Sequence, residues 1–177
     1  SYVRTFGTNA IISNCSNNYG PRQFPEKLIP KIIYNILNKK EIPIYAKGKN
    51  SREWIYVEDH CRGLFDIFRK GKSGQSYNIG TGFNITNLNL TKLLLKIVRN
   101  KKMEIGKRVK IKFVKDRPGH DFRYALNSRK ILKELKWKPK RNFDSGLNKT
   151  LSWYVENYSF FNYFSKKFFF KRLGLKL

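Results

Sequence analysis

The stretch that decides the predicted fold is Asn14-Cys15-Ser16-Asn17-Asn18-Tyr19-Gly20-Pro21. It follows the apolar run Ala10-Ile11-Ile12 and changes at once to amides, a hydroxyl and a Gly-Pro turn. A buried strand of an open α/β sheet typically ends in this way, with polar groups at the carboxyl edge where ligands bind. Asn17 and Asn18 could meet a ligand there, or they could form an Asn-rich turn, because Asn tolerates left-handed backbone. The spacing alone favours the turn.

Expected strands and helices alternate along the chain, which predicts an α/β architecture. The strands are expected at 10–14, 42–45, 53–57, 76–79 and 110–114. Helices are expected from 25 to about 40, from 58 or 59 to 71, after Asn87, from 128 to before Pro139, and from 144 or 145 onward. The helix that ends at Gly71 has Cys61, Leu64, Phe65 and Phe68 on one side. This spacing predicts that these four side chains face the core.

The composition is strongly basic, with 38 Lys and Arg against 12 Asp and Glu and a net charge of +26 over 177 residues. Such a charge makes nucleic acid or an acidic surface a partner to consider. The lysines are nevertheless scattered over the outer faces of the expected helices and through the loops. We therefore interpret the charge as a general compositional bias rather than as a nucleic-acid footprint.

The two cysteines, Cys15 and Cys61, are not paired by spacing and no signal peptide is visible. Both are expected to be buried, reduced thiols, which indicates the cytoplasm. His60 and His120 have no ligand partners at metal spacing, so no metal site is predicted. No apolar run approaches the roughly 20 residues of a membrane span.

Four blocks in a fixed order carry a family resemblance: Asn14 to Pro30, Pro43-Ile44-Tyr45 with Arg52 to His60, Tyr77-Asn78-Ile79-Gly80 with Asn87, and Asp116 to Asp121. Together they resemble the dTDP-glucose 4,6-dehydratases of the extended short-chain dehydrogenase/reductase family. The similarity extends from about Gly7 to Tyr154. The stretch from Gly80 to Ile85 departs from the family, which usually has Gly-Gly followed by polar residues and a Glu.

The resemblance implies the C-terminal part of a Rossmann-type enzyme, together with its smaller mixed α/β substrate-binding domain. Residues 1–24 would end the NAD-binding Rossmann domain. Residues 25–159 would form the nucleotide-sugar-binding domain, with 76–82 returning to the Rossmann sheet. Residues 160–177 would be a basic, aromatic C-terminal tail. We expect the chain to be a fragment, and the family implies that the full-length enzyme is a homodimer.

The family's reaction implies NAD, a Gly-rich dinucleotide loop and a Tyr-x-x-x-Lys pair on a helix, in which the Lys lowers the pKa of the phenol. Gly80-Thr81-Gly82 lacks the third glycine of that loop. Tyr45 with Lys49 and Tyr163 with Lys167 match the pair only by count, because neither context is a helix that stacks both side chains. No catalytic residue is therefore predicted, and the chain alone is expected to be inactive.

The resemblance also implies a set of binding residues. Asn18 would contact NAD and Asn17 the substrate, while the Arg52 guanidinium would bind the pyrophosphate. Without that resemblance, Arg52 would be a loop arginine in water and Asp116 to His120 a simple turn. The remaining substrate residues would be Lys27, Leu28, Pro43, Ile44, Tyr45, Asn87, Asp116, Arg117, Pro118, Gly119 and His120, with Tyr124 as a further neighbour.

Three functions remain in contention. The leading one is the substrate-binding portion of an NAD-dependent dTDP-glucose 4,6-dehydratase. A related nucleotide-sugar epimerase or decarboxylase shares the Asn-Tyr-Gly-Pro turn and the Val-Glu-Asp helix start. A basic nucleic-acid-binding module is a different class and would place aromatic and basic side chains together on one exposed face.

Overall fold

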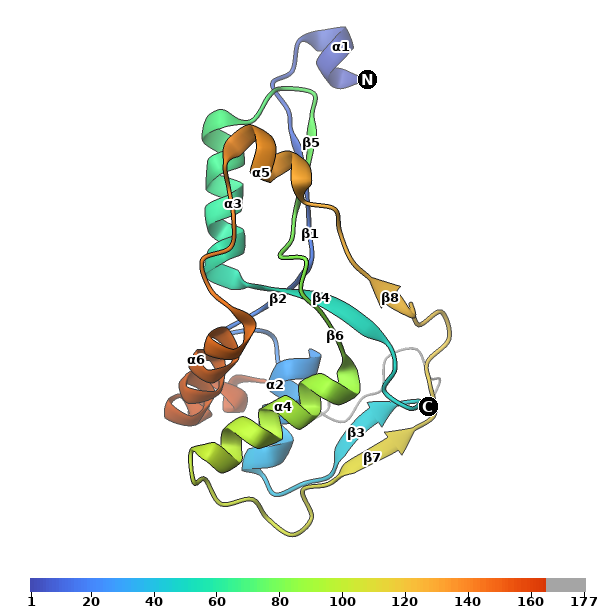
Figure 1. Ribbon diagram of the computed structural model, residues 1–177, viewed down its shortest axis with the longest axis vertical. Coiled ribbons are helices and arrows are strands. Elements are labelled where there is room, and N and C mark those ends of the chain that lie inside the picture. Colours follow the sequence, from blue (N-terminus) through green and yellow to red (C-terminus); the bar gives the residue numbers. More distant parts are fainter. Residues whose placement is uncertain (165–177) are drawn as a thin grey trace. The chain divides into compact units, whose positions relative to one another are not determined.

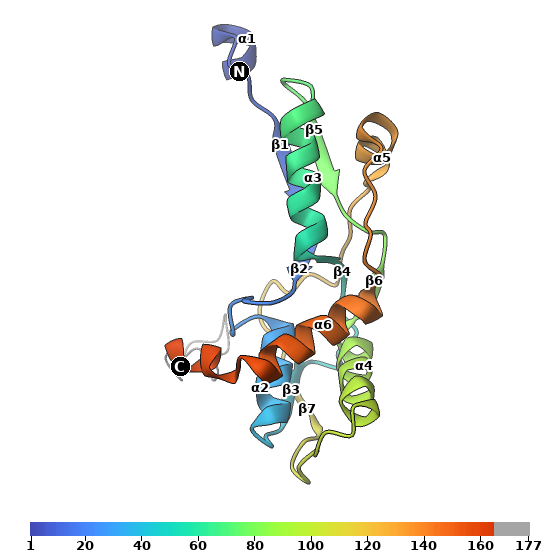
Figure 2. The ribbon, with the colours of Figure 1, turned by 90° about the vertical axis from the view of Figure 1, so that its left-hand side faces the viewer.

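The computed structural model describes residues 1–164, which divide into two compact units (Figures 1 and 2). Unit 1 comprises Ser1–Tyr19, Arg52–Asn84 and Tyr124–Phe143. Unit 2 comprises Gly20–Ser51 and Ile85–Arg123, together with the described residues from Asp144 onward. The chain thus crosses between the units several times. This division differs from the predicted succession of 1–24, 25–159 and 160–177, and the assignment of domains stays a prediction.

Unit 1 contains a parallel pair of strands, β1 (Ile12–Cys15) and β5 (Ser76–Ile79), in which Ile12 lies opposite Ser76 and Cys15 opposite Ile79. Helix α3 (Val57–Lys70) runs along this pair, as both ribbon views show. Gly63 permits the close packing, because a Cβ there would lie 2.9 Å from Ile79 Cγ2. The short helix α5 (Arg129–Leu135) packs against β5.

The core of unit 1 gathers side chains from α3, β5 and α5 and two residues outside these elements. Helix α1 (Tyr2–Phe6) contributes none of them. Burial of such apolar side chains is the main favourable term in folding. The cluster consists of Ile55, Ile67, Tyr77, Ile79, Ile131, Leu135 and Trp137, with Ile11 packed against it.

The second sheet contains β2 (Asn17–Tyr19), β4 (Ser51–Tyr56) and β6 (Asn84–Thr86) in that order, and β8 (Arg123–Tyr124) also pairs with β4. Strand β2 is parallel to β4, with Asn17 opposite Trp54 and Tyr19 opposite Tyr56. The Asn-rich turn, which the spacing alone favoured, is not formed, because this segment is a strand. The Tyr19 ring packs edge-on against the rings of Trp54 and Tyr56, which explains the pairing.

Unit 2 has helices α2 (Leu28–Leu37) and α4 (Asn87–Asn100) and the parallel strands β3 (Ile42–Tyr45) and β7 (Ile111–Val114). Helix α6 (Phe143–Glu156) continues into the 3₁₀ turn η1 (Tyr158–Tyr163). Pro30 is tolerated because it lies in the first turn of α2, where its missing N–H needs no partner. The fully buried side chains include Ile29, Ile32, Ile33, Ile36, Ile42, Ile44 and Tyr154.

The predicted strands at 42–45 and 76–79 are confirmed to the residue. The helix expected from 25 begins at Leu28, and α3 begins at Val57, with Glu58 and Asp59 in its first turn as predicted. The last helix begins at Phe143, so Asp144 lies inside its first turn. Of the predicted tail, residues 165–177 lie outside the described residues.

The predicted core face of α3 is wrong within unit 1. Leu64, Phe65 and Phe68 are 39%, 57% and 85% exposed, and Cys61 is exposed as well. Asp59, Gly63 and Ile67 are buried instead. The helical spacing of the apolar residues was predicted correctly, but the side of the helix that faces the sheet was not. The absent Cβ of Gly63 lets the side that carries Gly63 approach the sheet most closely. The expectation of a buried Cys61 thiol fails for the same reason.

Candidate functional site

In unit 2, the loops after β3 and β7 and the first turn of α4 lie together. The Asn50 Nδ2 donates to the Asp121 carbonyl at 3.1 Å, and the Asn87 N–H donates to the Asn50 carbonyl at 2.9 Å. The Leu88 N–H donates to the Gly48 carbonyl at 3.1 Å. Three segments that are distant in sequence are therefore joined by backbone and amide hydrogen bonds.

Gly48 and Asn50 make this junction possible, and sequence reasoning missed both. Gly48 has a positive φ of 67° and a Cβ there would lie 2.9 Å from both Ile44 Cγ2 and Leu88 Cβ. Only glycine accommodates this backbone and this close approach without strain. Asn50 is 5% exposed, so its amide is committed to the fold. The one available signal was the Gly-Lys-Asn-Ser composition of the turn itself.

The loop after β7 carries a closely coupled acid and imidazole. His120 Nδ1 lies 2.6 Å from Asp116 Oδ1, and the Arg117 N–H donates to the same oxygen at 2.9 Å. The hydrogen bond from His120 is the largest cause that lowers the pKa of Asp116. Since an ionised carboxylate can only accept, the proton of this pair resides on Nδ1. The His120 side chain is 6% exposed and its ring meets that of Tyr45 edge-on at 5.8 Å.

The predicted residues of unit 2 differ in where they lie. Tyr45, Asn87, Asp116 and His120 are brought together by the junction described above. Pro43 and Tyr45 are half-buried, whereas Ile44 is 1% exposed and its side chain lies in the core. Alternation along β3 explains this, because successive side chains point to opposite faces. Pro118 and Gly119 are exposed, and Gly119 takes the left-handed backbone of a tight turn.

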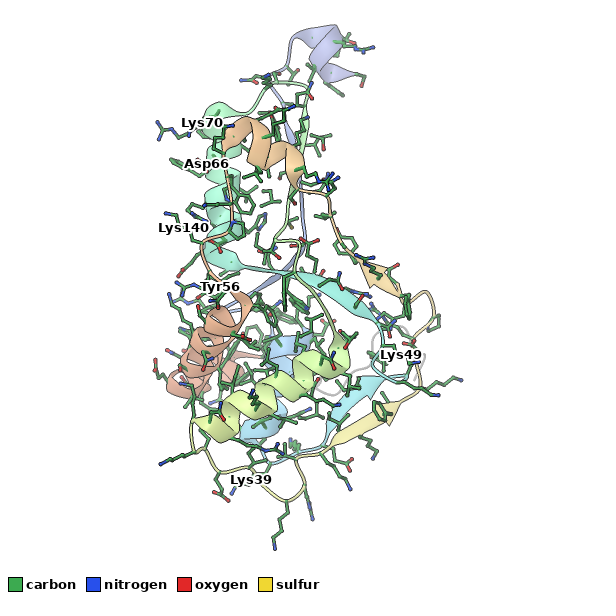
Figure 3. All side chains as sticks on the ribbon, viewed as in Figure 1. Lys39, Lys49, Tyr56, Asp66, Lys70 and Lys140 are labelled. Atoms are coloured by element: carbon green, nitrogen blue, oxygen red, sulfur yellow. The ribbon has the colours of Figure 1, made fainter. Side chains whose placement is uncertain are left out.

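The segments that form this junction also carry two buried polar atoms without a partner and several exposed lysines. The Asn87 Oδ1 and the Arg117 Nε are buried without a hydrogen-bond partner among the described residues. Such orphaned polar groups are costly and call for an explanation. Lys47, Lys49 and Lys115 are exposed on the same two loops, and Figure 3 shows Lys49 beside the start of β4. Lys27, the N-cap of α2, is exposed and Leu28 is half-buried.

Unit 1 carries the other predicted residues, Asn17, Asn18 and Arg52. The Asn18 Nδ2 donates to the Ser16 carbonyl at 3.2 Å and contacts Cys15 Sγ at 3.4 Å. Both asparagines are half-buried in β2, directly after the carboxyl end of β1. Arg52 is 8% exposed in β4, so it is not a loop arginine in water.

The Gly80-Thr81-Gly82 turn in unit 1 has a partner of its own. The Glu53 carboxylate, 1% exposed, accepts hydrogen bonds from the N–H groups of Thr81 at 2.6 Å and Gly82 at 2.8 Å. Its other oxygen accepts from the Leu126 N–H at 2.7 Å. A Cβ on Gly80 would overlap Glu53 Oε1. The N–H groups of Thr81 and Gly82 are therefore already bonded to Glu53 and are not free to bind a phosphate.

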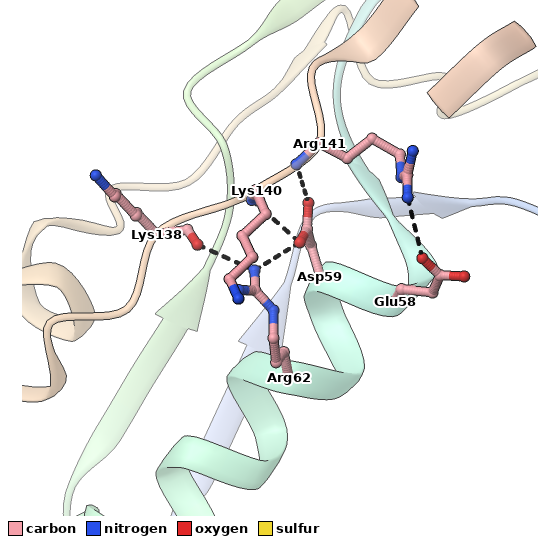
Figure 4. A network of polar contacts seen from close by, with 6 residues as sticks. All are labelled: Glu58, Asp59, Arg62, Lys138, Lys140 and Arg141. Carbon is pink, nitrogen blue, oxygen red and sulfur yellow. Dashed lines mark hydrogen bonds and ion pairs between the residues drawn. The ribbon is translucent and has the colours of Figure 1, made fainter. Parts of the chain in front are cut away.

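A second carboxylate in unit 1 joins α3 to the segment before α6 (Figure 4). Asp59, 4% exposed, accepts from the Arg62 guanidinium at 2.6 Å and from the backbone N–H groups of Lys140 and Arg141 at 3.1 and 2.9 Å. Arg62 also donates to the Lys138 carbonyl at 3.1 Å. The predicted role of Asp59 at the positive end of the helix dipole is thus only part of its function in the fold.

The described residues contain no helix that is long and apolar enough to cross a bilayer. Among residues 1–164, no three His, Cys, Asp or Glu side chains are grouped closely enough to hold a metal ion. Tyr45 ends a strand and Lys49 lies in the following turn, so they do not form a stacked pair on a helix. Lys167, the partner in the other Tyr-x-x-x-Lys match, lies outside the described residues.

Comparisons with known proteins agree with the α/β fold. The model of the GDP-mannose 4,6-dehydratase family matches residues 1–150. An Escherichia coli dTDP-glucose 4,6-dehydratase is 48% identical over 161 residues, which cover 89% of this chain and 44% of that one. The crystal structure of DesIV, a dTDP-glucose 4,6-dehydratase from Streptomyces venezuelae with NAD and TYD bound, superimposes with a TM-score of 0.80 at 42% identity and covers 88% of this chain and 47% of that one.

The parallel α/β fold and the loops at the strand ends place the chain among the extended short-chain dehydrogenases/reductases. Within them it belongs to the GDP-mannose 4,6-dehydratase family. A more distant match, the UDP-glucose 4-epimerase of Thermotoga maritima with UDP-glucose, has a TM-score of 0.78 at 27% identity. The chain spans about half the length of the curated relatives that it matches.

Proposed function

We propose that this chain is the nucleotide-sugar-binding part of an NAD-dependent dTDP-glucose 4,6-dehydratase, a lyase that converts dTDP-glucose into dTDP-4-dehydro-6-deoxyglucose and water. The observation that carries the proposal is the 48% identity to dTDP-glucose 4,6-dehydratases across 89% of the chain. The related epimerase is matched at only 27% identity. The full-length enzyme would act as a homodimer in the cytoplasm.

The junction in unit 2 supports the binding of a nucleoside diphosphate. Pro43 and Tyr45 offer an apolar, half-buried surface on which a base can pack. The Arg117 guanidinium and the exposed lysines of the two loops offer positive charge to a pyrophosphate. Asn87, whose Oδ1 is buried and unpartnered, can hydrogen-bond a hydroxyl of the ligand. Lys27 and Leu28 would line the phosphate and nucleoside side.

Unit 1 would contribute Asn17 to the sugar, Arg52 to the pyrophosphate and Asn18 to NAD. The place of Asn18 fits the cofactor, because dinucleotides bind at the carboxyl ends of parallel strands. When bound, NAD supplies the acceptor and donor of a hydride. The described residues bind and orient, and none of them forms the tyrosine–lysine pair that the chemistry needs. We therefore expect the 177-residue chain to bind nucleotide sugar without turnover.

Isothermal titration calorimetry on the purified chain tests this function. We expect dTDP-glucose to bind at least about tenfold more tightly than UDP-glucose, which corresponds to about 1.4 kcal/mol. Arg117→Ala should weaken dTDP-glucose binding about tenfold or more, whereas Arg99→Ala, at an exposed arginine of α4, should leave it unchanged. A preference for UDP-glucose would favour the epimerase. Binding only to single-stranded DNA, falling steeply with salt, would favour the basic nucleic-acid module.

A further inference from the structure

Unit 1 contains a cavity that has no part in the proposed dehydratase function. Its volume is about 480 Å³, and it lies between the turn after β5 and the segment that contains α5. The turn contributes Gly80 to Gly82, and the other segment contributes residues 126–129, Leu132 and residues 137–139. Small-molecule sites in proteins have volumes of this order. None of the lining residues belongs to the predicted substrate or cofactor set.

Part of the lining is apolar. Leu132, on α5, is 50% exposed, so its side chain is available to a ligand. Trp137 is 4% exposed, and its Nε1 would lie 3.2 Å from a Cβ on Gly63. The indole is therefore held between α3 and the cavity. Together with the half-buried Leu126 and Pro139, these side chains offer a firm surface on which a flat apolar group can pack.

Two cations line the same cavity. Arg129 and Lys138 are exposed, and neither side chain forms an ion pair within residues 1–164. Lys138 contributes only its carbonyl group to the network around Asp59, and Figure 4 shows its side chain directed away from that network. A phosphate or carboxylate group in the cavity would give both cations a partner. The planar guanidinium of Arg129 can bind such a group through two parallel N–H bonds.

A hydroxyl group in the lining also lacks a partner. The Ser128 Oγ is buried without a hydrogen bond to any described residue and would lie 2.9 Å from a Cβ on Gly80. A buried polar atom of this kind calls for an explanation. Ser128 is only half-buried as a residue, so a rotation about its Cα–Cβ bond can turn the hydroxyl from Gly80 toward the cavity. There it can donate to an oxyanion.

The charges around the cavity favour an anion. The Glu53 carboxylate lies behind the lining, where its oxygens already accept from three backbone N–H groups, and Asp59 is paired with Arg62. Residues 126–142 carry seven cations and one acidic residue, Glu134, which accepts from the Tyr77 hydroxyl. A cleft with such an excess of one sign attracts ligands of the opposite charge. The seven cations are Arg129, Lys130, Lys133, Lys136, Lys138, Lys140 and Arg141.

We propose that this cavity binds a small organic anion that combines a flat apolar body with one phosphate or carboxylate group. The body packs on Trp137 and Leu132, and the anionic group pairs with Arg129 and Lys138. Nucleic acid would need aromatic and basic side chains along an open face, whereas these groups converge on a cavity of small-molecule size. All lining residues belong to unit 1, and the proposal does not depend on the identity of the sugar nucleotide.

The test is a titration of the purified 177-residue chain with phenyl phosphate, followed by ¹H–¹⁵N NMR of the tryptophan indoles. The chain has three tryptophans, and the variant Trp137→Phe identifies the Trp137 signal. We expect this signal to shift and to saturate with a Kd below about 1 mM. A parallel titration with benzoate shows which anionic group binds more tightly. Inorganic phosphate and benzyl alcohol each carry half of the ligand's chemistry and should bind at least about fivefold more weakly than phenyl phosphate.

Two lysine variants separate the cavity from the general positive charge. Lys138→Gln removes a cation from the lining and should weaken phenyl phosphate at least about fivefold. Lys133→Gln makes the same change at an exposed residue of α5 outside the lining and should alter the Kd by less than about twofold. Leu132→Asn, at a half-exposed position, removes part of the apolar surface and should weaken binding about threefold. Unchanged Trp54 and Trp153 signals check that the variants are folded.

Several results would overturn the proposal. They are an unsaturated Trp137 signal with both phenyl phosphate and benzoate, equal losses in the two lysine variants, or binding of inorganic phosphate as tight as that of phenyl phosphate. Tighter binding of single-stranded oligothymidylate at Trp137 would assign the surface to nucleic acid instead. Arg117→Ala changes unit 2 and should leave the Trp137 titration unchanged. The failure of this site and the failure of dTDP-glucose binding are therefore distinguishable.

Discussion

The two units reach stability by different means. Unit 2 buries a nearly continuous apolar face of α2, with Ile29, Ile32, Ile33 and Ile36 at most 1% exposed. Unit 1 also has an apolar core, but in addition it places two nearly buried carboxylates, Glu53 and Asp59, on backbone N–H groups from other segments. Nine of the fourteen large hydrophobic side chains that are exposed in the described chain belong to unit 1, namely Tyr2, Phe6, Ile12, Leu64, Phe65, Phe68, Phe83, Tyr124 and Leu132.

The two kinds of contact differ in how accurately their groups must be placed. Apolar burial needs no specific direction, so this face of α2 can be stabilised by side-chain volume alone. A carboxylate that accepts several N–H bonds works only if each donor is correctly placed, which fixes loops as well as helices. Unit 1 should therefore be sensitive to single polar substitutions, and unit 2 to lost volume.

The largest expected effect is that of Glu53→Ala. Its removal leaves the partly buried N–H groups of Thr81, Gly82 and Leu126 without their acceptor and empties a site where the carboxylate is 1% exposed, and we expect a loss of about 3 to 4 kcal/mol in the free energy of unfolding. Urea unfolding followed by circular dichroism measures it. Glu58→Ala, at the exposed carboxylate of the same unit, should stay within about 0.5 kcal/mol. Equal losses at the two positions would remove the distinction between the units.

The second prediction concerns apolar volume. Ile33→Ala in α2 should cost about 3 kcal/mol, because the side chain is fully buried and its removal leaves a cavity. Phe68→Ala removes more atoms but from an 85% exposed position, so a change within about 0.5 kcal/mol is expected. Thermal unfolding of both variants decides the matter. A larger loss at Phe68 would mean that this side of α3 is already covered in the isolated chain.

Much of this fold could be predicted from the sequence, because 42–45 is a short apolar run followed by a basic loop that contains a glycine, and 76–79 alternates polar and apolar residues and ends at Gly80. The phase of α3 could not. Cys61, Leu64, Phe65 and Phe68 give the stronger apolar stripe, while the side that packs has a glycine and a buried Asp59. The spacing of apolar residues reports only where hydrophobic side chains lie. In α3, the close approach of Gly63 to β5 and the hydrogen bonds of Asp59 decide which side of the helix faces the sheet.

The candidate site shows the same division. Tyr45, Asn87 and the loop at 116–120 were found by resemblance, and the structure of unit 2 brings them together. Gly48 and Asn50, which hold the three segments in place, have no property in the sequence that separates them from any polar turn. Their roles depend on contacts between residues more than thirty positions apart, which no local pattern records.

Gly48→Ala is the third prediction and tests that junction. The substitution combines a left-handed backbone with contacts of 2.9 Å to Ile44 and Leu88, so we expect a loss of about 2 kcal/mol. Gly82→Ala in unit 1 is the matched control. Gly82 also has a positive φ, 74°, but a Cβ there meets nothing within 4 Å, so about 1 kcal/mol is expected. The difference between the two variants, measured by urea unfolding, isolates the close approach from the backbone strain.

The smallest expected effect is a pH dependence at the loop after β7. Asp116 has a pKa below its ordinary value, chiefly because of the hydrogen bond from His120. A carboxyl group whose folded pKa is lowered stabilises the fold above its unfolded pKa and loses that contribution as the pH falls through the folded pKa. The loop should therefore keep its structure at neutral pH and loosen only at a pH below the ordinary aspartate pKa of about 4.

NMR of the His120 ring as a function of pH measures this loosening directly. Asp116→Asn should abolish the transition, whereas a transition that persists in that variant would assign it to another group. Because Asp116 is partly exposed, global stability should change little, unlike the response of unit 1 to the loss of Glu53.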